Sequence, residues 1–243
     1  MRLLLYAWKG GQSILMIASS TKSLRIFFKY ITLSVVYLIV FGALWFIIVY
    51  ASIFRLSEKE VDSLLNRHSY TQCEEILSCI KDGDILIRRK ITEETEFFDK
   101  TINPYFTHTA LYLGDGLVFE AVGSRPNPAD DIVSYPLNQS DWIGNATVTP
   151  EKVFILRLSL EEQVLKSIRN SLSDIAQDPE YRFAFYITGE KRTQCSEVIL
   201  KELEKVGTFN GVLDVERIFP KHITPDYLFY FLSKNNAQII EVI

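Results

Sequence analysis

The stretch that decides the fold is FTHTALYLGDGLVFEAVG, residues 106–123. It has the pattern of two short strands joined by a Gly-Asp-Gly turn at residues 114–116. Each strand carries one polar residue in an apolar run, His108 in the first and Glu120 in the second. A carboxylate in such a strand is costly to bury unless it is paired. The pattern therefore predicts a hairpin that brings a histidine and a carboxylate together.

The length of the turn decides whether the two polar side chains can meet. A three-residue loop at 114–116 places Ala110 opposite Glu120. His108 and Glu120 then share one face as diagonal neighbours, with their backbones about 7–8 Å apart. A two-residue loop at 115–116 would put them on opposite faces, because side chains alternate along a strand. We expect the three-residue loop, and with it a base held by an orienting carboxylate.

A nucleophile for such a pair is found far along the chain, in TQCSEVILKELEKVG, residues 193–207. Apolar residues recur there with helical spacing, and we expect Thr193 as the N-cap and Gly207 as the C′ residue. Cys195 then falls in the first turn, where unpaired N–H groups and the helix dipole lower the pKa of a thiol. The same N–H groups can form an oxyanion hole. The alternative is that Cys195 is a small buried residue, as most free cysteines are.

Residues 30–54, YITLSVVYLIVFGALWFIIVYASIF, contain no charged residue. A helix of this length, about 37 Å, crosses a bilayer with some tilt. A core helix would show polar positions with a period of 3.6 residues, and a signal peptide would have a shorter apolar run, so we expect an uncleaved anchor. Residues 1–29 contain five Lys or Arg and no acid. This excess predicts a single-pass protein with a cytoplasmic N-terminus and an extracytoplasmic main domain, periplasmic or at the cell surface.

The charge and the cysteine content of the chain bear on its possible partners, cofactors and disulfides. The net charge is −4 and residues 1–29 carry +5, so the remainder carries −9. An acidic domain without a basic stripe argues against nucleic acid as a partner. The three cysteines and three histidines are scattered and form no CxxC pair, so we expect no metal and no cofactor. We interpret Cys73 and Cys79 as two buried thiols on one helix, because that spacing is poor for a bridge, and a disulfide is the alternative.

We expect four segments along the chain. These are a basic N-terminal segment at 1–29, a transmembrane helix at 30–54, a helical connector at 55–81 and a main domain at 82–243. The main domain is expected to be α+β, with a small antiparallel sheet packed on helices. Its strands are predicted at 85–88, 108–113, 118–122 and 153–158, and its helices at 159–177 and 193–207. Residues 124–145 are expected to be a long loop of the kind that lines a site.

Three motifs in order resemble the circularly permuted NlpC-type branch of the papain-like cysteine hydrolases, the YiiX/YebB-like group. They are Gly-Asp-Ile-Leu at 83–86, the His and Glu strands of 106–123, and Cys-Ser-Glu at 195–197. In ordinary papain-like enzymes the cysteine precedes the histidine, whereas here it follows. Over roughly residues 82–232, the resemblance implies a permuted papain-like domain. It implies Cys195 as nucleophile, His108 as general base and acid, and Glu120 as the residue that orients His108.

The expected function is a membrane-anchored thiol hydrolase, an amidase or peptidase that cleaves an amide or ester carbonyl through a thioester. The resemblance suggests peptide amides of cell-wall type or acylated lipids as substrates. It extends distantly to lecithin retinol acyltransferase, which makes acyl transfer the first alternative. A non-catalytic, membrane-tethered binding module is the second. The chain departs from the family pattern at Thr109-Ala110 and at Gln194, and these departures bear on the pocket more than on the triad.

Overall fold

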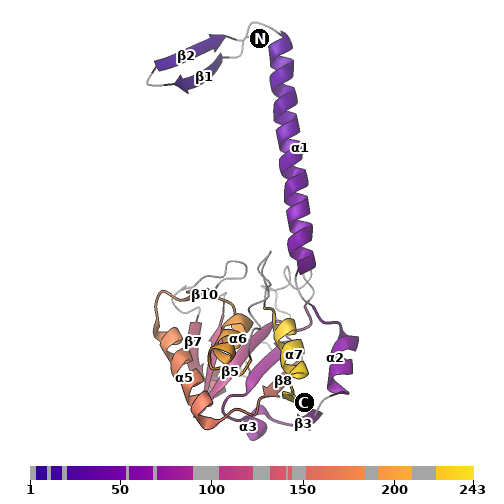
Figure 1. The fold of residues 1–243 in the computed structure, drawn as a ribbon, viewed down its shortest axis with the longest axis vertical. Coiled ribbons are helices and arrows are strands. Elements are labelled where there is room, and N and C mark those ends of the chain that lie inside the picture. The colour runs from indigo at the N-terminus through magenta and orange to yellow at the C-terminus, as the bar shows by residue number, and fades with distance from the viewer. Residues whose placement is uncertain are drawn as a thin grey trace. The chain divides into compact units, whose positions relative to one another are not determined.

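The computed structural model (Figure 1) describes residues 4–9, 12–17, 21–52, 55–67, 70–89, 104–122, 132–140, 142–143, 152–183, 191–209 and 223–243. The chain divides into two compact units, Met1–Ala51 and Ser52–Ile243. Each unit is described by itself below.

The first unit contains a hairpin and one long helix. Strands β1 (Leu4–Lys9) and β2 (Gln12–Ile17) pair antiparallel, which the sequence analysis did not predict. Helix α1 (Thr21–Ser52) follows, and its stretch Phe27–Trp45 is long and apolar enough to cross a membrane. The apolar side chains described in that stretch are exposed, unlike those of a core helix. A signal sequence near an N-terminus would have the same length and composition. Residues 53–54 of the expected anchor lie outside the described residues.

The second unit is built on a seven-stranded mixed sheet. The expected α+β class is confirmed, but the expectation of a small, purely antiparallel sheet was wrong, because three further strands join it and one pair is parallel. Its strands are β3 (Tyr70–Cys73), β4 (Ile85–Arg89), β5 (His108–Gly114), β6 (Leu117–Ala121), β7 (Ile132–Pro136), β8 (Lys152–Arg157) and β11 (Gln238–Val242). The order is β3-β11-β8-β4-β5-β6-β7, and only the β3–β11 pair is parallel. The four predicted strands are the central ones, β8 to β6.

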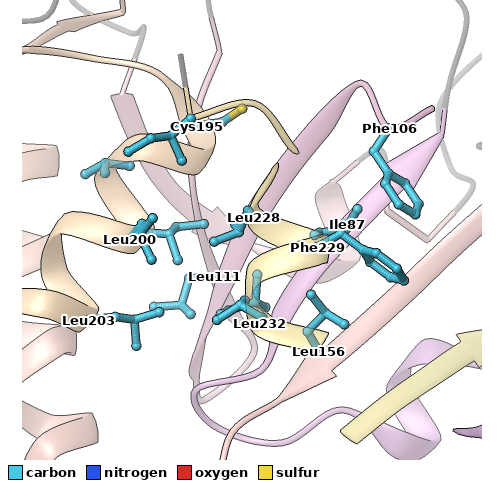
Figure 2. Close-up of a cluster of buried hydrophobic side chains, with 14 of the residues drawn as sticks. Ile87, Phe106, Leu111, Leu156, Cys195, Leu200, Leu203, Leu228, Phe229 and Leu232 are labelled. Atoms are coloured by element: carbon cyan, nitrogen blue, oxygen red, sulfur yellow. The ribbon is translucent and has the colours of Figure 1, made fainter. Parts of the chain in front are cut away.

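Three helices pack with one face of this sheet. They are α5 (Glu162–Gln177), α6 (Cys195–Lys205) and α7 (Pro225–Lys234), and the two-residue strands β9 (Arg182–Phe183) and β10 (Arg192–Thr193) lie between α5 and α6 in the chain. Side chains alternate between the two faces of the sheet along each strand, so the strands contribute to a hydrophobic cluster on each face. Ile87 and Leu111 pack with α6 and α7, whereas Leu86 and Ala110 pack in a second cluster on the other face. Figure 2 shows the first cluster, in which Leu200 of α6 and the side chains of α7 meet the sheet.

Two expectations outside the central strands were wrong. Residues 124–145 are not all loop: β7 and the 3-10 helix η2 (Leu137–Gln139) form there, because Ile132 and Leu137 are buried. Residues 55–81 are not a separate helical connector. They contain α2 (Glu58–Leu65) and α3 (Ile76–Cys79), but β3 between them pairs with β11.

The cysteine prediction in this segment was also wrong. Cys73 ends β3 and Cys79 ends α3, and a disulfide joins them, with their Cα atoms 6.4 Å apart. Glu75 between them has an extended backbone. The chain therefore leaves the strand and turns into a new helix, and the spacing rule for a continuous helix does not apply.

The β5–β6 hairpin differs from the prediction in its turn but not in its register. The turn has two residues, 115–116, and both have positive φ, as a type I′ turn requires. A β-bulge between Tyr112 and Gly114 adds one residue to β5. Leu111 therefore still pairs with Phe119, as the three-residue loop would require. The two polar residues of the hairpin share a face for this reason.

Candidate active site

His108 and Glu120 form the centre of the site. His108 begins β5 and Glu120 lies in β6, and the His108 Nε2 atom is 2.7 Å from the Glu120 Oε2 atom. The Glu120 residue is only 3% exposed. A buried carboxylate accepts hydrogen bonds and cannot donate them when ionised, so Nε2 carries the proton. The other ring nitrogen, Nδ1, is then the one that can exchange a proton with a substrate or a nucleophile.

Trp142 completes the surroundings of this pair, and the sequence analysis did not identify it. Its Nε1–H donates to the Glu120 Oε2 atom over 3.2 Å. Its ring is stacked on the His108 ring, with 5.8 Å between centroids and 26° between planes. The Arg88 guanidinium carbon lies over the Trp142 ring, 4.6 Å from its centroid. Trp142 therefore fixes both the carboxylate oxygen and the plane of the imidazole. It belongs to the segment 124–145 that was predicted to line a site.

Cys195 is the first residue of α6, as predicted, although the N-cap is Gln194 and not Thr193. The Gln194 side chain makes no capping hydrogen bond to the helix. The first N–H groups of α6 are therefore not occupied by the cap. Cys195 is 7% exposed, and it is the one free cysteine among the described residues. Figure 2 shows its sulfur at the N-terminal end of α6, pointing away from the Leu200 and Leu203 side chains.

Cys195 and His108 lie close enough to shift each other's pKa. Burial alone would raise the pKa of the Cys195 thiol, but His108, with a smaller contribution from Thr109, lowers it from 9.0 to about 7. Burial alone would lower the pKa of His108, but Cys195 and Glu120 raise it to about 9. His108 and Arg88 lower the pKa of Glu120 against the effect of its burial. Between about pH 7 and pH 9 the pair is therefore a thiolate beside an imidazolium.

The start of α6 can also stabilise an oxyanion. Backbone N–H groups in a first helical turn point away from the helix toward its N-terminal end. The Gln194 Nε2 atom is buried and has no hydrogen-bond partner among the described residues. An unpaired buried donor is costly, unless a ligand provides its acceptor. Gln194, the residue before Cys195, therefore has a buried side-chain donor that a ligand could satisfy.

A second buried carboxylate, Asp226, supports the strand that carries His108. It lies in the first turn of α7 and is fully buried. Its Oδ2 atom accepts N–H bonds from Leu56 at 2.9 Å and Tyr105 at 3.0 Å, and its Oδ1 atom accepts one from Phe106 at 2.7 Å. Burial raises the pKa of Asp226 to about 6, although the three N–H groups act in the opposite direction. The sequence showed only a helix start there, with proline at N1.

The other candidates are further from this chemistry. His68 and His222, the other two histidines of the chain, lie outside the described residues. Within the described part of the chain, no group of three His, Cys, Asp or Glu side chains could hold a metal ion. A cavity of about 300 Å³ lies between the β4–β5 region and α5, lined by Leu113, Leu165 and Arg169 among others. None of the three predicted catalytic residues lines it.

Comparison with known proteins finds a distant similarity to a solved structure. No family model matches the chain, and no curated protein matches it at a significant level. A crystal structure described as that of the metalloprotein yiiX from Escherichia coli O157:H7, DUF1105, is similar to 67% of this chain and 96% of its own. The identity is 19% and the TM-score is 0.45. The similarity to YiiX is therefore a distant one.

Proposed function

We propose that this chain is a membrane-anchored cysteine hydrolase that cleaves an amide or ester carbonyl through a thioester. Cys195 is the nucleophile, His108 the general base and acid, and Glu120 the residue that orients His108. The 2.7 Å contact between His108 Nε2 and Glu120 Oε2 is the observation that carries the proposal. It leaves Nδ1 for the thiol that starts α6, and this order of nucleophile, base and orienter is that of a catalytic triad.

The chemistry follows from the charges of the pair. The Cys195 thiolate attacks the carbonyl carbon, and the oxyanion is stabilised by N–H groups at the start of α6. The C–N or C–O bond then breaks, and the leaving amine or alcohol takes a proton from the His108 imidazolium. Neutral His108 next removes a proton from water, which attacks the thioester and releases the acid. Thiolate and imidazolium are restored, and Glu120 stays ionised throughout.

An activated ester tests this scheme before the natural substrate is known. With p-nitrophenyl butyrate, we expect a butyryl adduct on Cys195 in intact-mass spectra, together with release of nitrophenolate. The adduct should be absent in Cys195→Ala and should form more slowly in His108→Ala. A chain that forms no adduct, or forms it equally well without His108, would contradict the proposal.

Glu120→Gln should slow turnover of this ester by about tenfold or more, a part of what general acid–base catalysis contributes. It should also change the pH profile. The carboxylate raises the pKa of His108, so its removal lowers that pKa. The alkaline limb of the pH–rate curve, expected near pH 9 in the unmodified chain, should therefore move to lower pH. Glu162→Gln, in the first turn of α5, is the control. An unchanged alkaline limb in Glu120→Gln would show that Glu120 does not act on His108.

The disulfide supports the proposal that the second unit is extracytoplasmic. Disulfides persist in oxidising compartments and are rare in the cytoplasm. In full-length chain purified without reductant, we expect one alkylatable thiol after denaturation and three after reduction, since Cys73 and Cys79 are paired. Cys195→Ala should have none before reduction. Three free thiols in the unreduced chain would favour a cytoplasmic domain.

A further inference from the structure

Thr109 directly follows His108 in β5 and is fully buried. It pairs across the sheet with Ile87 of β4, and paired residues in neighbouring strands point to the same face. The Ile87 side chain belongs to the hydrophobic cluster that includes Cys195, and α6 packs against β5. The Thr109 side chain therefore faces the helix that begins with Cys195.

The hydroxyl group of Thr109 has no structural task in this position. Its Oγ1 atom is buried and has no hydrogen-bond partner of normal geometry among the described residues. A buried polar group without a partner is destabilising, and valine would fill the same space without such a group. The packing of the core therefore does not explain why this strand carries a threonine.

The neighbour on which Thr109 acts is the Cys195 thiol. Burial raises the pKa of this thiol and His108 lowers it, and the hydroxyl and the peptide N–H of Thr109 lower it further. The paired part of β5 and β6 begins only at Leu111 and Phe119, so Thr109 lies before it, at the end of β5 that carries His108. Hydrogen bonds to an ionised acceptor are shorter and stronger than those to a neutral one. Ionisation of Cys195 therefore provides the acceptor that the buried hydroxyl lacks.

Thr109 is uncharged, which separates its effect from that of the charged groups around the start of α6. These groups include His108 in β5, Glu120 in β6, Arg88 in β4, Glu197 in α6 and Asp226 in α7. Glu197 is already paired with Lys201, with 2.9 Å between their Oε1 and Nζ atoms. Removing the Thr109 hydroxyl changes no charge in the site. A change in the titration of Cys195 then reports the loss of a hydrogen bond.

We propose that Thr109 stabilises the Cys195 thiolate through its hydroxyl and its peptide N–H. This inference rests on the proposed cysteine-hydrolase function and adds a residue to it. The same donors act when the thioester is hydrolysed. Water adds to the carbonyl carbon and gives a proton to His108, the C–S bond breaks, and its electron pair returns to the Cys195 sulfur. Thr109 then stabilises the sulfur as the leaving group.

Thr109→Val tests the proposal, because it removes the hydroxyl and keeps the shape and the peptide N–H. The rate at which iodoacetamide alkylates Cys195 is measured against pH in the full-length chain. We expect the midpoint to rise from about pH 7 by about one unit, roughly the effect of one hydrogen bond to a charged group. At pH 6 alkylation should be about threefold slower, since the less acidic thiolate is more nucleophilic.

Two further variants serve as controls for this shift. Thr109→Ser keeps the hydroxyl and should keep the midpoint near that of the unmodified chain. Thr71→Val makes the same change at an exposed position of β3 and should leave the midpoint unchanged. An unshifted midpoint in Thr109→Val would overturn the inference, and so would an equal shift in Thr109→Ser.

Stability distinguishes this role from a structural one. At pH 5 the thiol is protonated, so Thr109→Val should leave the urea midpoint of unfolding of the full-length chain in detergent unchanged or higher. A lower urea midpoint together with the alkylation shift would indicate a loosened core and would also overturn the inference. With p-nitrophenyl butyrate, the butyryl adduct should persist longer in Thr109→Val. If the unmodified chain forms no adduct while the alkylation midpoint shifts as expected, the hydrolase proposal fails and the effect of Thr109 on the thiolate stands.

Discussion

Replacing His108 with alanine is expected to slow alkylation of Cys195 by iodoacetamide at pH 6 at least about tenfold. His108 holds the pKa of this thiol at about 7 instead of 9.0. At a pH below both pKa values, a difference of two pKa units changes the thiolate fraction about a hundredfold. The more acidic thiolate is also less nucleophilic, which reduces the difference in alkylation rate to about tenfold. Because burial alone raises the pKa of Cys195, the effect in the variant should exceed this minimum.

The pH profile of the alkylation rate separates this explanation from a general change in access. In the unmodified chain the rate should rise with a midpoint near pH 7, and in His108→Ala only above pH 9. His68→Ala, which removes another of the three histidines, is the matched control and should leave the profile unchanged. A midpoint near pH 9 in the unmodified chain, unaffected by His108→Ala, would mean an ordinary buried cysteine. The non-catalytic binding module would then be the better interpretation.

The pairing of His108 with Glu120 could be predicted from the sequence because alternation along a strand fixes the face of each side chain. The turn could not. A three-residue loop, or a two-residue loop with a bulge, gives the same register, and Gly114, Asp115 and Gly116 all accept positive φ. The local sequence pattern does not distinguish between these two turns. The prediction of the shared face was thus correct although the predicted loop was wrong.

The residues that the sequence analysis missed make contacts across long separations. Trp142 is 22 positions from Glu120, and Asp226 is 170 positions from Leu56. The spacing of apolar residues predicts each helix or strand separately and shows which of its faces is apolar. It does not tell which loop comes to lie over a hairpin, or which helix start meets which strand. A tryptophan in a polar loop and an aspartate beside a helix-starting proline were the available signals, and both have common local explanations.

The prediction of a helical connector at residues 55–81 was wrong for the same reason, because local patterns do not show long-range contacts. A run of apolar residues at helical spacing predicts a helix, and α2 does form there, with a capping box at Ser57 and Glu60. Strand β3 has a partner, β11, near the other end of the chain. Pairing with a distant strand overrides local helical spacing, since a strand edge satisfies its backbone groups only through such a partner. The disulfide at Cys73 follows from that pairing and not from the local pattern.

Asp226→Ala is expected to reduce the free energy of unfolding by about 4 kcal/mol, a large part of the stability of an ordinary domain. The variant leaves three buried N–H groups without an acceptor, those of Leu56, Tyr105 and Phe106. Each unpaired buried group costs about 1–3 kcal/mol, and removal of a buried charge offsets part of the sum. Urea unfolding at pH 7 of a fragment starting at Ser52, the first residue of the second unit, measures this and keeps the Leu56 peptide N–H. Asp82→Ala, at an exposed carboxylate paired with Arg169, is the control and should cost less than about 1 kcal/mol.

The pH dependence of this stability distinguishes the Asp226 carboxylate from a merely well-packed side chain. Its pKa is about 6 in the folded state and about 3.9 in an unfolded chain, so the folded state binds the proton more tightly. The contribution of Asp226 to the free energy of unfolding is therefore fully present below about pH 4. It falls by roughly 3 kcal/mol as the pH rises through about 6. Asp226→Asn cannot ionise and should lose this slope. It should also be less destabilised than Asp226→Ala, because its one carbonyl oxygen still accepts a hydrogen bond. Equal costs for the two variants, with the slope retained in both, would show that the three N–H groups do not depend on this carboxylate.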